Sequence, residues 1–134
     1  DIRSPAGALG LMQVMPRTGR QTAKELNLRW RGNNTLINPS TNIRIGSYYL
    51  AKQLERFGHP ALAAAAYNAG PHRVKQWVPD ESMPLDAWVA SIPFTETRNY
   101  VQRVLSAQVI YEWRYNGAIT RLESVAASQI TKKE

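Results

Sequence analysis

Two polar residues close a segment that is otherwise almost entirely alanine. The run ALAAAAYNAGP begins at Ala61, and Tyr67 and Asn68 arrive where a helix would end at Gly70. Alanine side chains let a helix pack its backbone close to its neighbours, while a phenol and a carboxamide can form directed hydrogen bonds. A buried helix with an ordinary Asn-Ala-Gly end has the same pattern. The segment therefore predicts either a structural helix or one that delivers two polar groups to a site.

Two further stretches carry side chains suited to a polar ligand. GLMQVMP, at residues 10–16, places the Gln13 carboxamide between two methionines. IPFTETRNYV, at residues 92–101, carries Glu96 near the start of a predicted helix. An acidic residue in a first turn is stabilised by about 0.3–1 kcal/mol through the helix dipole, so Glu96 has a structural explanation too. A lone glutamine likewise carries no functional signal by itself.

The clearest helix predicted from the sequence is NPSTNIRIGSYYLAKQLERFG, at residues 38–58. Asn38 or Ser40 can cap its start, and Gly58 can end it in a left-handed conformation. Apolar or small residues recur at intervals of three and four along one face, which we expect to be buried. These residues are Ile43, Gly46, Leu50, Leu54 and Phe57.

Proline and glycine punctuate the rest of the chain. Helices are predicted after Pro16, over residues 60–68, after Pro71, around residues 88–92 and over residues 95–116. Trp113 lies mid-helix among apolar residues, so we expect it in the core. Residues 11–15 could form a brief strand, and residues 120–123 fit a capping box that would begin a last short helix. The predicted fold class is mainly α with at most a very small sheet.

Composition excludes several classes of protein. The chain has 134 residues, of which 43% are hydrophobic and 20% charged, as expected for one globular domain. No window approaches the ~20 apolar residues of a membrane span. There is no cysteine, and His59 and His72 each lie next to a proline, where a helix is predicted to begin. Because metal sites need clustered ligands, we expect neither a metal nor a cofactor.

The net charge of +7 favours a polyanionic partner such as nucleic acid, anionic lipid or an acidic cell-wall polymer. Cations and indoles are mixed at Arg29, Trp30 and Arg31, and again from Arg73 to Trp77. Such mixtures are typical of single-strand binders, but they also suit sugar rings. Nucleic-acid binding is therefore one hypothesis, and charge alone does not decide it.

Taken together, GLMQVMP, AYNAGP and IPFTETRNYV, with SPAGA ahead of the first and NPSTNIRIGSYYL between the first two, resemble the catalytic domain of soluble lytic transglycosylases. These bacterial enzymes of the goose-type lysozyme superfamily cleave peptidoglycan. The likeness covers roughly residues 1–115 and implies a lysozyme-like, mainly α fold. It implies a transglycosylase domain at 1–117 that lacks its N-terminal part, followed by a tail at 118–134.

The resemblance also implies a reaction. Lytic transglycosylases cleave the β-1,4 bond between N-acetylmuramic acid and N-acetylglucosamine without water, leaving 1,6-anhydro ends. One glutamic acid protonates the bridging oxygen and then takes the proton of the C6 hydroxyl. The family places this glutamate in a Glu-Ser pair upstream of Asp1, so we expect it to be absent here and this fragment alone to be inactive. The alternative is a non-catalytic peptidoglycan-binding module.

Roles for single residues follow from the same resemblance. Tyr67 is expected to orient the missing general acid with its hydroxyl. Substrate binding is expected from Gly10, Met12, Gln13, Met15, Asn68 and Glu96. The implied location is the bacterial periplasm, and the implied partner is the peptidoglycan glycan strand, not nucleic acid. Additional domains, and peripheral contact with the cell wall or the inner face of the outer membrane, are expected of the full-length protein.

Overall fold

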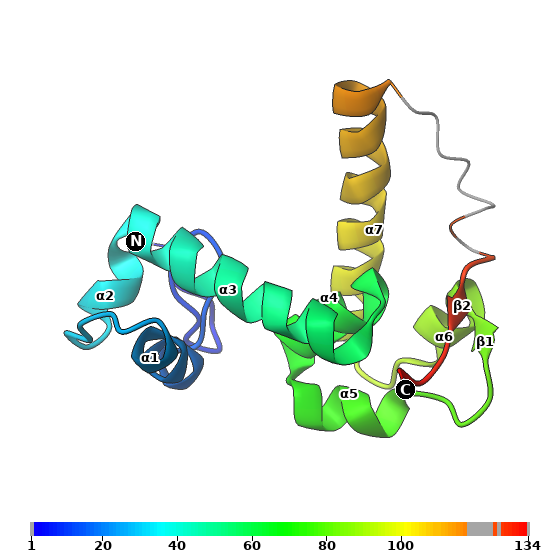
Figure 1. Cartoon of the computed structure of the whole chain (residues 1–134), viewed down its shortest axis with the longest axis horizontal. Helices are drawn as coiled ribbons and strands as arrows, with labels where there is room; N and C mark the ends of the chain where they lie inside the picture. Colours follow the sequence, from blue (N-terminus) through cyan, green and yellow to red (C-terminus); the bar gives the residue numbers. More distant parts are fainter. Residues whose placement is uncertain (1, 118–124, 126, 134) are drawn as a thin grey trace. The chain divides into compact units, whose positions relative to one another are not determined.

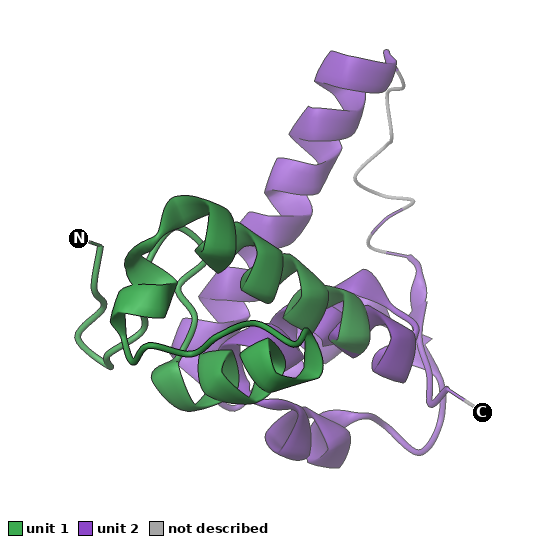
Figure 2. Cartoon of the chain, turned by 60° about the vertical axis from the view of Figure 1, so that its left-hand side comes forward, with its two compact units in different colours: residues 1–52 green, residues 53–134 purple. Residues whose placement is uncertain are grey.

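The computed structural model describes residues 2–117, 125 and 127–133. Two compact units make up the chain, residues 1–52 and residues 53–134 (Figure 2). The helices, labelled in Figure 1, are α1 (Pro16–Glu25), α2 (Asn34–Ile37), α3 (Pro39–Phe57), α4 (Pro60–Ala69), α5 (Pro71–Trp77), α6 (Leu85–Ser91) and α7 (Thr95–Asn116). β1 (Met83–Pro84) and β2 (Gln129–Ile130) form an antiparallel pair. The mainly α prediction with a very small sheet is confirmed.

The first unit opens with a tight reversal of the chain where a strand was expected over residues 11–15. The amide of Leu9 donates to the carbonyl of Val14 at 2.9 Å, and the amide of Val14 donates back at 3.0 Å. Gly10 at φ +74° and Gln13 at φ +50° make this turn possible. The strand prediction is wrong because two left-handed residues fold the segment back on itself. The very small sheet lies in the second unit instead.

α3 buries a face that only partly matches the predicted one: Gly46 and Phe57 are buried as expected, but the apolar residues between them are not. Ile43 and Leu54 are 46% and 44% exposed, whereas Asn42 is fully buried. Ile45 and Gln53 are buried with it. A polar side chain can replace an apolar one in the core when its hydrogen bonds are satisfied, and Asn42 satisfies this condition. At the helix start, the Oδ1 atom of Asn38 accepts from the amide of Thr41 at 3.0 Å, as the predicted cap requires.

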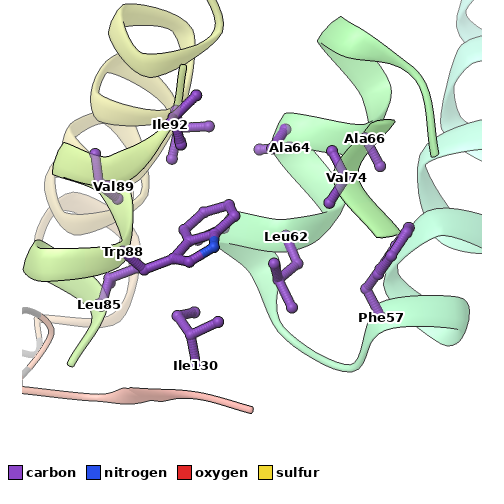
Figure 3. Packing of buried hydrophobic residues seen from close by; sticks show 13 residues of the cluster. Phe57, Leu62, Ala64, Ala66, Val74, Leu85, Trp88, Val89, Ile92 and Ile130 are labelled. Carbon is purple, nitrogen blue, oxygen red and sulfur yellow. The ribbon is translucent and has the colours of Figure 1, made fainter. Parts of the chain in front are cut away.

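The second unit is built around α4. All six residues from Ala61 to Ala66 are buried, and α4 packs against both α5 and α7. Trp88 of α6 is completely buried, and its indole nitrogen donates to the carbonyl of Trp77 at 2.9 Å. Figure 3 shows the Trp88 ring between α6 and Leu62 of α4, with Ile130 of β2 nearby. The small side chains of α4 thus let this helix lie deep in the core.

α7 is buried only along its first half. Thr97 and Val101 are buried, and the half-buried Tyr100 packs against the core, where burial raises the pKa of its phenol. Trp113 is 61% exposed, so its predicted place in the core is wrong. The cause is geometric: α4 and α6 contact α7 near its start, and Figure 1 shows its last turns extending past both. Gly117 ends the helix at φ +63°.

Part of the stretch after residue 117 belongs to the second unit, because Ile130 is fully buried in that core. The short helix predicted at residues 120–123 lies outside the described residues. Among the helices that the structure describes, none combines the length and apolar character needed to cross a membrane.

Candidate functional site

Tyr67 and Asn68 lie in the last turn of α4, and local interactions fix where this helix begins and ends. The Nδ1 atom of His59 accepts from the amide of Ala61 at 3.0 Å and caps the helix, as its place before a predicted helix suggested. Because Nδ1 accepts, Nε2 carries the proton and faces the hydroxyl of Ser128 at 3.3 Å. Burial lowers the pKa of His59, which favours this neutral form. Gly70, at φ +95°, ends the helix after Asn68.

Asn68 is held by a neighbour that sequence reasoning missed. The hydroxyl of Thr97, in the first turn of α7, donates to Oδ1 of Asn68 at 2.8 Å. Thr97 is only 1% exposed, so this bond is protected from water. It fixes which end of the carboxamide is occupied and leaves the Nδ2 amino group without a partner among the described residues. The half-buried Asn68 therefore presents a donor at the junction of α4 and α7.

Glu96 lies one residue before Thr97 and is exposed in the first turn of α7. The neighbouring Arg98 donates to the hydroxyl of Thr95 at 3.2 Å rather than pairing with Glu96. Glu96 thus directly precedes Thr97, whose hydroxyl binds the side chain of Asn68. Its exposure suits a contact to a ligand, whereas a general acid needs burial in a dry pocket.

An aromatic and cationic group precedes α7. Phe94 contacts Trp77 edge to face with ring centroids 5.2 Å apart, and the guanidinium of Arg73 lies 5.0 Å from the Phe94 ring. Phe94 is 41% exposed, so part of its ring is open to solvent. Trp77 is half-buried. The group resembles the mixture of rings and cations that stacks on sugars or bases.

In the first unit, Asn42 organises the turn that carries Gln13. Its Nδ2 atom donates to the carbonyls of Leu9 and Leu36, both at 2.9 Å. Its Oδ1 atom accepts from the amide of Met12 at 2.8 Å. Both donors and one acceptor position of this fully buried carboxamide are thus used. Sequence reasoning missed Asn42 because only apolar and small residues were counted toward the buried face of its helix.

Gly10 is required by this arrangement. A Cβ atom at Gly10 would lie 2.3 Å from Nδ2 of Asn42 and 2.6 Å from the carbonyl of Leu36. No side chain fits in that space, and φ is +74°. Gly10 therefore allows the backbone to lie close to the side chain of Asn42. Contact between Gly10 and a glycan stays a prediction.

The turn presents Gln13 between two differently placed methionines. Nε2 of Gln13 donates to the carbonyl of Gly10 at 2.8 Å, which orients the half-buried carboxamide. The sulfur of Met12 lies 3.6 Å from the hydroxyl of Ser47 and its side chain packs on the core. Met15 is 44% exposed, immediately before α1. The structure thus groups Gly10, Met12 and Gln13 in one turn, and groups Asn68 with Thr97 at a helix junction.

Within the described ranges, no group of three or more histidine or acidic side chains lies close enough to hold a metal ion. The chemistry available at these two places is hydrogen bonding by carboxamides, a phenol and an exposed carboxylate, beside aromatic rings. Such groups bind polar ligands with apolar faces, as sugars have.

Comparison with known proteins identifies relatives for most of the chain. The model of the transglycosylase SLT domain matches residues 1–86, and that of the soluble lytic transglycosylase helical domain matches residues 91–118. The soluble lytic murein transglycosylase of Salmonella typhimurium is 46% identical over 114 residues, which are 82% of this chain and 18% of that protein. The chain therefore spans less than a fifth of this relative's length.

Two solved structures are similar in three dimensions. An inactive Glu-to-Gln mutant of the lytic transglycosylase Slt from Pseudomonas aeruginosa is 45% identical with a TM-score of 0.80, over 92% of this chain and 21% of that one. A 70-kDa soluble lytic transglycosylase in complex with bulgecin A is 36% identical with a TM-score of 0.85, over 97% of this chain and 22% of that one. The resemblance and the lysozyme-like fold predicted from the sequence are confirmed.

Proposed function

The chain belongs to the transglycosylase SLT domain family, and on that premise we propose that it is the main part of a peptidoglycan lytic transglycosylase domain. The observation that carries the proposal is the family match over residues 1–86, which includes both the Gln13 turn and the helix bearing Tyr67 and Asn68. The proposed reaction cleaves the β-1,4 bond between N-acetylmuramic acid and N-acetylglucosamine and leaves a 1,6-anhydro end.

The proposed roles follow the hydrogen bonds. Asn68, with its Oδ1 atom occupied by Thr97, offers an amide donor to a sugar oxygen. Gln13, with its Nε2 atom occupied by Gly10, offers Oε1 as an acceptor for an acetamido N–H or a hydroxyl. Glu96 binds sugar hydroxyls from the first turn of α7, and Tyr67 orients the general acid. Each fixed carboxamide thus offers one directional, uncharged hydrogen bond to a sugar group.

The general acid is proposed to be a glutamate outside these 134 residues. Such a group must be protonated near neutral pH, which requires burial and a raised pKa. Glu96 is exposed, and the hydrogen bond from Lys52 lowers the pKa of Glu25. The inactive Glu-to-Gln mutant of the Pseudomonas aeruginosa relative supports a glutamate in this role. The 134-residue chain alone is therefore proposed to bind glycan without cleaving it.

The proposed partner is the peptidoglycan glycan strand in the bacterial periplasm. The murein transglycosylases to which the chain is similar support this partner. Additional domains and peripheral contact with the cell wall or the inner face of the outer membrane are proposed for the full-length protein. Nucleic acid is not a proposed partner.

The test compares the 134-residue chain with the same chain extended N-terminally through the glutamate-bearing segment. Purified sacculi are incubated with each, and soluble products are analysed by mass spectrometry. The extended chain should release fragments ending in 1,6-anhydromuramic acid, and the shorter chain should release none. Binding of sacculi without any release by the extended chain would instead identify a peptidoglycan-binding module. Release by the shorter chain would place the acid within these residues.

A further inference from the structure

A hollow lined by cations lies in the second unit, where the end of α3, the end of α5 and the residues after β2 meet. Its volume is about 200 Å³. The cations that line it are Arg56, Lys75, Lys132 and Lys133. They come from three segments that are far apart in the sequence, so it is the fold that brings their charge together. We call this feature the cationic hollow.

Helix ends explain only part of this charge. Arg56 lies in the last turn of α3 and Lys75 in the last turn of α5, where the helix dipole favours a cation. Lys132 and Lys133 belong to no helix and follow Ile130, whose complete burial holds the start of this segment against the core. Among the described residues, none of these cations forms an ion pair. An anionic ligand would supply the counter-charge.

Two of the cations are held in place by neutral groups, so their charge stays available. The ammonium of Lys133 donates to the backbone carbonyl of Glu55 in α3. The guanidinium of Arg56 lies 5.5 Å from the centroid of the Phe57 ring. A side chain that is already ordered has less conformational entropy to lose when it binds a ligand. The cationic hollow is therefore partly formed before any ligand binds.

The size and lining of the cationic hollow indicate which kind of anion fits. Its apolar lining residues, Phe57, Leu62 and Val78, are buried or half-buried, and the hydroxyl of Thr131 adds a neutral donor. A volume of 200 Å³ corresponds to about seven water molecules at about 30 Å³ each, which suits a small anion rather than a segment of a polymer. Phosphate oxygens accept several charge-assisted hydrogen bonds at once, and both arginine and lysine bind them.

We propose that the cationic hollow binds a phosphate or diphosphate group. The proposal does not rest on the proposed function, because no residue of the hollow is among those proposed to bind glycan. The group can belong to the headgroup of an anionic lipid or to a soluble phosphate ester, and the chemistry of recognition is the same. Nucleic acid fits less well, because its successive phosphates need a row of cations, whereas these cations surround a single small hollow.

The test measures binding of inorganic diphosphate to the whole chain by calorimetry at one ionic strength. Two kinds of vesicle, with phosphatidylglycerol and with phosphatidylcholine alone, are compared by sedimentation, and a single-stranded oligonucleotide is the last ligand. In wild type, two-dimensional NMR spectra should show the largest shifts on addition of diphosphate at the amides of Arg56 and of residues 131–133. This readout needs no variant. Shifts confined to other parts of the chain would contradict the proposed site.

The hollow variant combines Arg56→Gln, Lys75→Gln and Lys132→Gln, which remove three charges and keep the helix propensity of α3 and α5. Lys133 is left unchanged because it binds the backbone of α3. The matched control loses the same charge from three exposed cations that are clustered on α1 in the first unit, and it combines Arg17→Gln, Arg20→Gln and Lys24→Gln. Circular dichroism checks that each variant is folded.

Wild type should bind diphosphate, and the hollow variant should bind it about 10- to 100-fold more weakly, while the control stays within about twofold of wild type. If binding of phosphatidylglycerol vesicles is lost in the hollow variant and kept in the control, the phosphate group belongs to a lipid. Diphosphate binding without vesicle binding would assign it to a soluble ester.

Three results would overturn the proposal. Wild type could bind neither diphosphate nor phosphatidylglycerol vesicles, or the affinity could fall equally in the hollow variant and the control, which would indicate a general effect of net charge. Tighter binding of the oligonucleotide than of diphosphate, lost in the hollow variant, would assign the cationic hollow to nucleic acid. None of these results changes the proposed function, which the digestion of sacculi tests separately.

Discussion

The hydroxyl of Thr97 donates a 2.8 Å hydrogen bond to Oδ1 of Asn68 and so joins the first turn of α7 to the end of α4. Two of the sequence motifs, AYNAGP and IPFTETRNYV, meet in this bond. The amino group of Asn68 can then point in only one direction, because the carbonyl end of the carboxamide is occupied. The bond thus holds the Nδ2 amino group of Asn68, near the end of α4, in one orientation as a hydrogen-bond donor.

Replacing Thr97 by valine should destabilise the protein by about 1–2 kcal/mol, because the shape is kept while a buried donor is lost. The affinity for peptidoglycan should fall as well, since the freed carboxamide of Asn68 can rotate. Chemical denaturation and sacculus binding measure the two effects. Thr97→Ser keeps the hydroxyl and is the control. Equal denaturation midpoints for the two variants would show that the bond contributes nothing.

Alanine substitutions at Gly10 and Gly32 can test how tightly Gly10 packs against Asn42. Both have φ near +73°, but a Cβ atom at Gly32 would meet nothing within 4 Å, whereas one at Gly10 would collide with Asn42 and Leu36. Gly32→Ala should cost about 1 kcal/mol for the backbone conformation. Gly10→Ala should cost about 2–4 kcal/mol, because the collision is added.

The free energy of unfolding of the two alanine variants measures this difference. Hydrogen exchange should also accelerate at the amide of Met12 in Gly10→Ala, because displacement of Asn42 removes the acceptor of that amide. Similar losses in both variants would contradict the close contact at Gly10.

His59 makes the start of α4 sensitive to pH. Burial lowers its pKa from the ordinary value of 6.5. A group with a depressed pKa contributes stability that is complete above its unfolded pKa and is lost as the pH falls through its folded pKa. A protonated ring also cannot accept from the amide of Ala61. Stability should therefore decline as the pH falls below about 6.5, by about 1 kcal/mol or less for a half-exposed cap.

The measurement is the midpoint of denaturation at pH 7 and at pH 5 for wild type and for His59→Asn. Asparagine caps helices well and does not titrate. The loss of stability between pH 7 and pH 5 should be smaller in His59→Asn than in wild type, and the difference is the contribution of His59. An identical decline in both proteins would remove His59 as the cause.

Tyr67→Phe should reduce kcat of the extended, glutamate-containing chain by about 10- to 100-fold and leave KM within about twofold. Loss of a group that positions the acid lowers the rate of the chemical step without removing a contact to the sugar. Turnover of soluble glycan strands gives both constants. Tyr115→Phe, at a position 65% exposed near the end of α7, is the control and should match wild type. A rise in KM with unchanged kcat would assign Tyr67 to substrate binding.

The sequence was sufficient for the elements whose ends depend on local chemistry. The start of α4 at Pro60, the start of α7 at Thr95 and its end before Gly117 agree with the predicted positions. Prolines, caps and left-handed glycines act within a few residues, so a single sequence reveals them. The residue motifs likewise sufficed to identify the family.

Long-range packing was not predictable in the same way. Asn42 is buried because carbonyls and an amide from residues 9, 12 and 36 converge on it, and no periodicity along α3 indicates those partners. Trp113 is exposed although Val109 and Ile110 precede it, because the buried residues of α7, Thr97 and Val101, lie near the start of the helix. The bond between Thr97 and Asn68 also joins residues 29 apart in the chain.

The most direct test of the proposed reaction is isotopic. Digestion of sacculi by the extended chain in water enriched in ¹⁸O separates the two ways of cleaving the glycosidic bond. If the C6 hydroxyl attacks, the new muramyl ends should be 1,6-anhydro and should carry no ¹⁸O. Reducing ends containing one ¹⁸O atom would show attack by water and would contradict the proposed transglycosylase function.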